Sequence, residues 1–210
     1  MYNFITLGND CSPAAALRNL QLRDVALPFD WVVSTFHFLN ECFENNFKKY
    51  HTDLKFNSTH TRLIDSYGFE FPHDYPVTNY IHNNEQIGEG SFGEDTGRVI
   101  VEDWVKYYDI VKEKYNRRIE RFLNIMRDNT PLIVLTRYNA EEVSALKIML
   151  EYHFNRKDVV IVNSCETESI FNDIICCNTE KNGTWNDSAI WKENIEKAID
   201  IVKNKYPKRV

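Results

Sequence analysis

The sequence has few of the features that mark a multidomain chain or a membrane protein. Its 210 residues include only 7 glycines and 6 prolines, and no stretch is rich in glycine, serine and proline, so nothing in it resembles a linker. No apolar run approaches the roughly 20 residues of a membrane-spanning helix. Met1 leads directly into a predicted strand, without the pattern of a signal peptide. We therefore expect a single domain over residues 1–210 and a cytoplasmic, intracellular protein.

The chain also lacks an excess of basic residues and any paired cysteine motif. It has 25 Lys and Arg against 31 Asp and Glu, a net charge of −6, which gives no electrostatic footprint for nucleic acid or an anionic membrane. Its five cysteines show no C-x-x-C spacing of the kind found in zinc sites and redox motifs. We expect no metal, no cofactor, no nucleic acid and no membrane partner. We interpret four of the cysteines as structural: Cys42, Cys165, Cys176 and Cys177.

Short apolar strands alternate with helical patterns along most of the chain. The predicted strands are residues 2–7, 131–136, 159–162 and 174–177. The predicted helices are residues 14–20, 34–47, 99–128, 140–154 and 188–202. Continuous apolar strands separated by helices are typical of a mostly parallel sheet with helices on both faces, so we expect an α/β domain of three layers. Residues 77–97 are polar and glycine-rich, which predicts a long surface loop or lid.

The first 20 residues place a cysteine between a predicted strand and a predicted helix. A turn follows the strand, and Ser12-Pro13 is then a typical helix start with Ser12 as the cap. At such a position backbone N–H groups and the helix dipole favour an anion and lower the pKa of a thiol. Cys11 is therefore a candidate nucleophile, although a small buried hydrophobic residue is the commoner role of an intracellular cysteine.

Candidate substrate-binding residues follow from the predicted sheet. Ligands of parallel sheets bind beyond the carboxyl ends of the strands, and Cys11 follows the first strand. Arg137 and Asn139 follow the strand 131–136, so they line the same edge if the two strands are parallel. The aromatic Trp31 is a third candidate for contact with a substrate.

A cysteine nucleophile needs a histidine as proton acceptor and a third group that orients the histidine. Of the six histidines, His73 is distinguished by a preceding proline, a following carboxylate and two aromatic neighbours, Phe71 and Tyr75. Those rings could shield an ion pair from water. The aromatic setting is also compatible with a structural histidine.

The third group and the oxyanion donor stay open at this point. Asp74 follows His73 directly, but consecutive strand residues point to opposite faces, so Asp30, which lies between two aromatic residues, could orient the histidine instead. The side-chain amide of Asn9, or the backbone N–H groups at the helix start, could donate hydrogen bonds to an oxyanion.

A glycine-rich segment at residues 88–93 matches the G-x-G-x-x-G phosphate loop of protein kinases. The lysine-bearing strand and the HRD and DFG motifs of a kinase are absent, and the segment does not follow a strand and open a helix as a dinucleotide-binding loop would. We interpret it as part of the surface loop.

Four ordered motifs run through about two thirds of the chain. They are ITLGNDCS (residues 5–12), LPFDW (27–31), FPHDY (71–75) and EKYNRRIERF (113–122). Together they resemble an uncharacterised family of predicted papain-like cysteine peptidases with bacterial and large-DNA-virus members. The resemblance implies a cysteine hydrolase with Cys11 as nucleophile and His73 as base. It also implies a papain-like α+β fold as the alternative to the parallel sheet.

Several functions are compatible with these residues. The first is a peptidase-like hydrolase that acts on peptide or other acyl substrates through a Cys11 thioester. The alternatives are a non-enzymatic binding or interaction module, an esterase or acyltransferase, and a nucleotide-sugar-dependent transferase on a Rossmann-like sheet that uses Arg137 and residues 88–93.

Overall fold

The structure is a computed structural model, and it describes residues 2–79, 81–82, 85–86 and 98–207. The kinase-like segment 88–93 and much of the predicted loop 77–97 lie outside the described residues. Within the described ranges, no helix is both long enough and apolar enough to cross a membrane.

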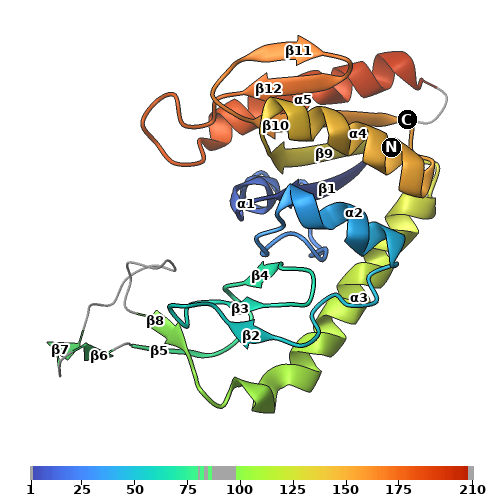
Figure 1. Cartoon of the computed structure of the whole chain (residues 1–210). Helices are drawn as coiled ribbons and strands as arrows, with labels where there is room; N and C mark the ends of the chain where they lie inside the picture. Colours follow the sequence, from blue (N-terminus) through green and yellow to red (C-terminus); the bar gives the residue numbers. More distant parts are fainter. Residues whose placement is uncertain (1, 80, 83–84, 87–97, 208–210) are drawn as a thin grey trace.

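A five-stranded sheet forms the core of one half of the protein, the upper half in Figure 1. Its strands lie in the order β1 (Asn3–Gly8), β9 (Leu132–Arg137), β10 (Val159–Ser164), β12 (Ile174–Cys177) and β11 (Ser169–Phe171). The first four strands are parallel, and β11 pairs antiparallel with β12 at the edge. The prediction of an α/β fold with a mostly parallel sheet is therefore confirmed, and the main sheet is not that of the α+β alternative.

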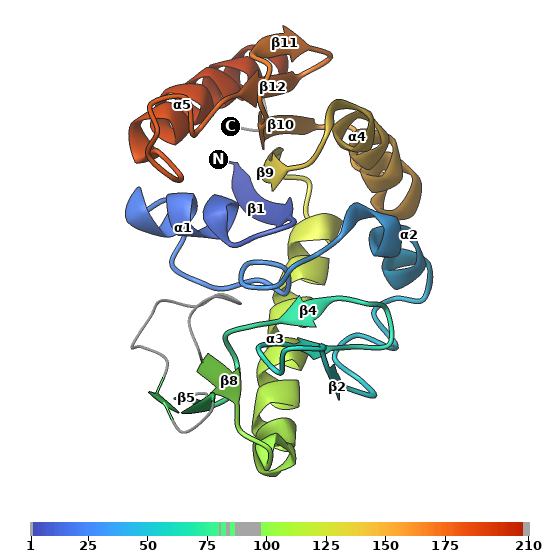
Figure 2. The same ribbon diagram turned by 60° about the vertical axis from the view of Figure 1, so that its left-hand side comes forward.

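Helices cover both faces of this sheet (Figure 2). On one face lie α1 (Ser12–Asn19) and α5 (Ser188–Lys205), and on the other lie α2 (Phe36–Glu44) and α4 (Ala140–Phe154). Alternate strand residues point to the two faces: Phe4 of β1 packs in the core under α1 and α5, whereas Ile5 and Leu7 pack in the other core. Both faces of each strand are apolar because both are buried.

A cluster of aromatic rings extends the second core away from the sheet. Phe29 of the LPFDW motif lies at its centre and is 1% exposed. Five rings have centroids 5.6–6.1 Å from that of Phe29: Phe43, Phe47, Tyr50, Phe69 and Phe122. Phe122 belongs to the long helix α3 (Tyr108–Arg127). Two of the four sequence motifs therefore meet in this core, which explains their aromatic residues by packing.

Short antiparallel strands occupy the half of the molecule beyond this cluster. The strands are β2 (Lys55–Phe56), β3 (Leu63–Ile64), β4 (Glu70–Phe71), β5 (Val77–Asn79), β6 (Ile81–His82), β7 (Glu85–Gln86) and β8 (Arg98–Ile100). They pair as β2-β3-β4, β5-β8 and β6-β7. Within the predicted surface loop or lid 77–97, the described residues thus include the short strands β5, β6 and β7.

The predicted helix over residues 99–128 begins later than its apolar spacing indicates. Residues 98–100 form β8, a short 3₁₀ helix covers Trp104–Tyr107, and α3 starts at Tyr108. The Ile100 N–H donates to the His60 carbonyl (2.8 Å), and the Trp104 ring packs edge-on against Tyr75 (5.5 Å). Tertiary pairing of the first residues thus overrides their helical periodicity.

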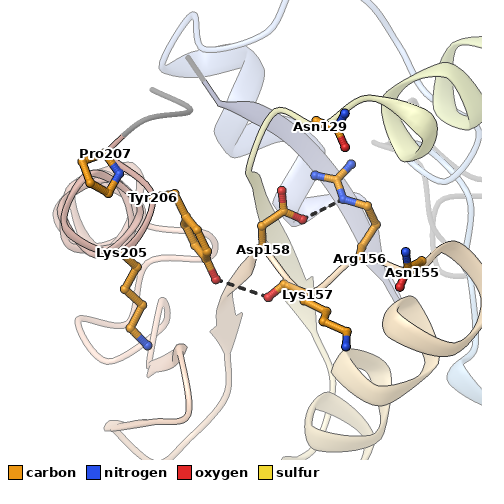
Figure 3. Close-up of a pocket in the computed structure, with 8 residues that line it drawn as sticks. All are labelled: Asn129, Asn155, Arg156, Lys157, Asp158, Lys205, Tyr206 and Pro207. Atoms are coloured by element: carbon orange, nitrogen blue, oxygen red, sulfur yellow. Dashed lines mark hydrogen bonds and ion pairs between the residues drawn. The ribbon is translucent and has the colours of Figure 1, made fainter.

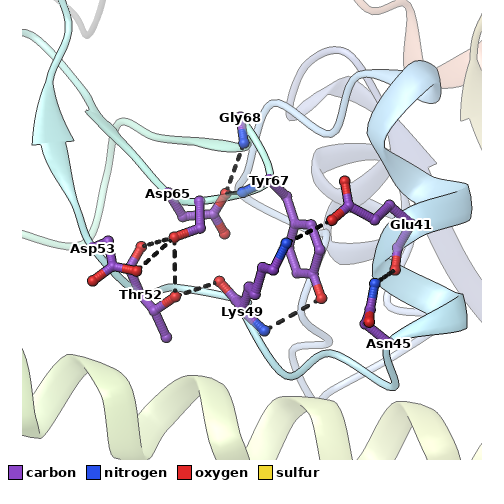
Figure 4. A network of polar contacts seen from close by, with 9 residues as sticks. Glu41, Asn45, Lys49, Thr52, Asp53, Asp65, Tyr67 and Gly68 are labelled. Carbon is purple, nitrogen blue, oxygen red and sulfur yellow. Dashed lines mark hydrogen bonds and ion pairs between the residues drawn. The ribbon is translucent and has the colours of Figure 1, made fainter.

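The turn before β4 is organised by one carboxylate (Figure 4). Asp65 is 6% exposed and accepts hydrogen bonds from the backbone N–H groups of His51, Tyr67, Gly68 and Phe69 at 2.8–3.1 Å. Gly68 has φ +97°, a conformation that favours glycine. A Cβ atom there would lie 2.5 Å from the Phe38 ring. The turn thus needs both the aspartate and the glycine.

Candidate active site

Cys11 lies in the turn between β1 and α1, at the carboxyl edge of the sheet. Its carbonyl accepts the Ala15 N–H (2.9 Å), which makes Cys11 the cap residue of α1. The expectation that Ser12 caps the helix is wrong, since Ser12 is its first residue. Asp10 takes over the role of a capping side chain, because its Oδ1 accepts hydrogen bonds from the Ser12 N–H (2.8 Å) and Oγ (2.6 Å).

The end of β1 is packed tightly against the end of β9. Gly8 pairs with Arg137 in the parallel register, and a Cβ on Gly8 would lie 3.3 Å from the Arg137 nitrogen and 3.5 Å from Pro13 Cγ. Glycine therefore permits the close approach of both strand ends and α1. Ser34 fixes the other side of this residue, since its Oγ donates to the Gly8 carbonyl (2.7 Å).

Arg137 links the Cys11 turn to a loop after β12. Its guanidinium pairs with Asp10 (3.2 Å) and with Glu180 (2.7 Å). Two carboxylates therefore flank the cation that the sequence suggests for substrate binding. Asn139 is the cap of α4, where its Oδ1 accepts the N–H groups of Glu141 (3.0 Å) and Glu142 (2.9 Å). These two hydrogen bonds of Asn139 stabilise the start of α4.

The electrostatic setting of Cys11 differs from the one that its place in the sequence suggests. Burial and the neighbouring Asp10 raise the pKa of the Cys11 thiol above its ordinary value of 9.0, while its backbone N–H and Arg18 act in the opposite direction. The expectation that the helix start lowers this pKa is therefore wrong, because desolvation and a carboxylate outweigh the helix. Cys11 is a neutral thiol at pH 7.

A chain of contacts leads from α1 to His73. Arg18 lies seven residues after Cys11, on the same side of α1 and about 10 Å along its axis. The Arg18 guanidinium lies over the Trp31 ring at 4.8 Å, and the Trp31 ring meets the His73 ring edge-on at a centroid distance of 6.4 Å. Trp31 thus separates the α1 surface from the His73 loop.

His73 is held next to α3 by its neighbour Asp74. The Asp74 carboxylate pairs with Lys114 (2.5 Å) and accepts a hydrogen bond from the Tyr115 hydroxyl. Burial lowers the pKa of His73 below 6.5, Asp74 opposes this shift, and Arg62 adds to it. The imidazole is therefore neutral at pH 7 and can accept a proton.

Asp30 belongs to the loop that covers β1, the outermost strand of the sheet. Its buried carboxylate accepts hydrogen bonds from Thr6 Oγ1 (2.5 Å) and the Leu27 N–H (2.7 Å), and it pairs with Arg23 (2.5 Å). All of these described partners stabilise the loop over the strand edge. The structure therefore gives Asp30 a structural environment in the loop over β1.

The structure describes separate contacts for the nucleophile and base candidates. The Cys11 carbonyl caps α1, and the His73 ring meets the Trp31 ring. Asn9 is exposed beside Cys11, whereas the Ser12 N–H, one of the candidate oxyanion donors, already donates to Asp10. Cys11, Arg18, Trp31 and His73 together form what we call the candidate site.

A large groove at the opposite edge of the sheet is separate from this site (Figure 3). It has a volume of about 710 Å³ and lies near the starts of β9 and β10. Its buried Arg156 binds Asp158 (2.8 Å) and the carbonyls of Ile125 (2.8 Å) and Thr130 (2.5 Å). These bonds tie the end of α3 to the sheet, so Arg156 serves the fold there.

Comparison with known proteins agrees with the sequence motifs. A family model described as "Putative papain-like cysteine peptidase" matches residues 2–164, which is more than three quarters of the 210 residues. The match includes every residue of the candidate site. No curated protein and no solved structure matches the chain.

Proposed function

The chain belongs to this family of predicted papain-like cysteine peptidases, and from that premise we propose that it is a cysteine-dependent hydrolase of peptide or other acyl substrates. In this proposal Cys11 is the nucleophile and His73 is the general base. The observation that carries it is the contact chain from α1 through Arg18 and Trp31 to His73. It supports a site that spans the sheet edge and the His73 loop.

The proposed reaction starts from a neutral thiol and a neutral imidazole. His73 takes the proton of Cys11 as the sulfur attacks the acyl carbon, and the imidazolium then protonates the leaving group. Water, activated by His73, hydrolyses the thioester and returns both groups to their starting state. The proposal requires Cys11 Sγ and the His73 ring to lie within hydrogen-bond reach in the substrate complex.

Asp74 is the proposed positioning residue of this site. Its ion pair with Lys114 and its bond with Tyr115 anchor the His73 loop to α3. A carboxylate beside His73 also stabilises the imidazolium that forms during the reaction. The proposed substrate contacts are Trp31, which contacts Arg18, and Arg137, which pairs with Asp10 next to Cys11 in the chain.

Acylation with p-nitrophenyl acetate, a general acyl donor, tests the proposal. We expect Cys11 to be acetylated at pH 7 at least about 100-fold faster than Cys165, because a positioned base contributes 10²–10⁴-fold. Cys165 is a suitable internal control, since it is also half-buried and its thiol pKa is also raised, to about 11. Peptide mass spectrometry measures both rates in one sample.

Two histidine variants complete this experiment. His73→Ala should reduce the acetylation of Cys11 to about the rate of Cys165, whereas His60→Ala, at an exposed histidine that contacts Glu102 (3.1 Å), should leave it unchanged. Equal rates at Cys11 and Cys165 in the unaltered protein would reject the hydrolase. They would favour a binding module, for which the double pairing of Arg137 with Asp10 and Glu180 is the supporting observation.

A further inference from the structure

Two cysteines outside the candidate site lie side by side at the carboxyl edge of the sheet. Cys165 follows the last residue of β10, and Cys176 lies in the neighbouring strand β12. Both pack in the core on the α4 side of the sheet, and the two thiols interact with each other. The spacing of these cysteines in the sequence matches no motif, which favours a structural role, but the sheet brings them together.

The backbone geometry at this point is well defined. The Cys165 N–H donates to the Cys177 carbonyl (2.9 Å), which continues the parallel pairing of Ser164 with Cys177. Cys165 and Cys176 are therefore diagonal neighbours, and a strand spacing of about 4.8 Å with a rise of about 3.3 Å per residue separates their Cα atoms by about 8 Å. A disulfide needs about 4.4–6.8 Å. Cys165 lies one residue beyond the end of β10, and the disulfide requires its backbone to move towards Cys176.

The two thiols differ in exposure as an attacking and a resolving thiol do. Cys165 is half-buried and within reach of solvent, whereas Cys176 is 5% exposed. The adjacent Cys177 is buried in the core on the opposite, α5 side of the sheet, so it is a poor partner for Cys165. Cys165 thus has one well-placed thiol partner, Cys176.

We infer that Cys165 and Cys176 form a dithiol site that a small-molecule disulfide, such as glutathione disulfide, oxidises to an intrachain disulfide. The Cys165 thiolate attacks one sulfur of glutathione disulfide and releases one glutathione thiolate. Cys176 then loses its proton and attacks Cys165 Sγ, which releases the second glutathione thiolate. The protein dithiol is oxidised by two electrons, and one glutathione disulfide is reduced to two thiols.

The environment of the pair sets the expected rate. Burial and the neighbouring Cys176 thiol raise the pKa of Cys165 to about 11. Thiolate is the attacking species, so oxidation is slow at pH 7 and accelerates about tenfold for each pH unit up to about pH 10. The resulting bond closes a short loop that contains β11 and should raise the melting temperature by about 5 °C.

The test is incubation of the whole chain with glutathione disulfide at pH 8.5, followed by peptide mapping without reduction. The expected product is a Cys165–Cys176 crosslink that dithiothreitol reverses. Accumulation of glutathione on Cys165 with Cys176 as a free thiol would overturn the inference, as would a crosslink of Cys165 to Cys177 or no reaction at all.

A matched pair of variants separates the two neighbouring cysteines. Cys177→Ser should still form the crosslink, whereas Cys176→Ser should carry stable glutathione on Cys165. Loss of the crosslink in Cys177→Ser alone would contradict the assignment. If either variant fails to fold, the non-reducing peptide map of the unaltered chain decides which cysteine pairs with Cys165. Cys11→Ser should form the Cys165–Cys176 crosslink as the unaltered chain does, because this site is independent of the proposed hydrolase.

Discussion

Replacement of Asp65 by alanine is expected to lower the free energy of unfolding by about 4 kcal/mol. The carboxylate accepts four backbone N–H groups, those of His51, Tyr67, Gly68 and Phe69. A buried donor that loses its acceptor costs about 1–3 kcal/mol, and the partly buried Gly68 N–H can regain water. The turn that leads to β4 and onward to His73 therefore depends on one side chain.

Chemical denaturation at pH 7 measures this effect against a matched substitution nearby. Asp53 is an exposed aspartate that accepts a hydrogen bond from Ser66 Oγ (2.8 Å). We expect Asp53→Ala to cost about 1 kcal/mol, because residue 53 has φ +52°, a conformation that aspartate adopts more readily than alanine. A similar loss in both variants would show that the buried amide groups of the Asp65 turn find other partners.

The second large effect is a pH dependence in which two buried groups oppose each other. Burial lowers the pKa of His51 from 6.5 to about 4. His51 of the unfolded chain therefore binds a proton below about pH 6.5, whereas His51 of the folded chain binds it only below about pH 4. As the pH falls from about 6.5 to about 4, this difference lowers the free energy of unfolding by about 3 kcal/mol.

Asp65 acts with the opposite sign over nearly the same range. Burial raises its pKa from 3.8 to about 6, although four backbone N–H groups act against the shift. The folded chain binds this proton at a higher pH than the unfolded chain does, so stability increases by about 3 kcal/mol as the pH falls from about 6 to 3.8. The two contributions nearly cancel between pH 6 and pH 4.

Asp65→Asn isolates the contribution of His51 to the pH dependence of stability, because asparagine does not titrate. The free energy of unfolding of this variant should fall by about 3 kcal/mol more than that of the unaltered protein between pH 6.5 and pH 4. Denaturation curves at half-unit pH steps provide the measurement, with Asp53→Asn as the control that follows the unaltered protein. If the free energy of unfolding changed with pH in the same way in Asp65→Asn and in the unaltered protein, the opposite contributions assigned to His51 and Asp65 would be contradicted.

The main sheet could be predicted from the sequence because its strands are apolar on both faces. Runs such as residues 131–136 stay apolar without interruption only when both faces are covered, which also predicts the helices. The start of α3 could not be predicted from the sequence, because the apolar spacing over residues 99–107 is helical. Only the contacts of Ile100 and Trp104 with distant residues make this segment non-helical.

Part of the candidate site could be predicted from the sequence. The sequence placed Cys11 at a helix start and Arg137 at the same sheet edge, as the register of β1 and β9 shows. Arg18 was missed, although its spacing of seven residues from Cys11 in a helical segment is a usable signal. Glu180 carries no local signal, because its partner Arg137 is 43 residues away.

The electrostatics of Cys11 could not be obtained from its position in the chain. A helix start lowers a thiol pKa only where the thiol stays solvated. Here burial and Asp10 outweigh the helix, and burial is a property of the folded structure. A neutral thiol and a neutral histidine are therefore the starting point of the proposed reaction.

The pH dependence of Cys11 acylation tests the central claim most directly. The rate of p-nitrophenol release in a single turnover would be measured from pH 5 to pH 10 in the unaltered protein and in His73→Ala. With His73 as the base, the rate in the unaltered protein levels off above about pH 6.5, because the pKa of His73 lies below that value. In His73→Ala the rate should rise past pH 9 as the Cys11 thiolate forms. Identical profiles that rise through pH 9 in both proteins would contradict the account, since they would show a buried thiol without a base.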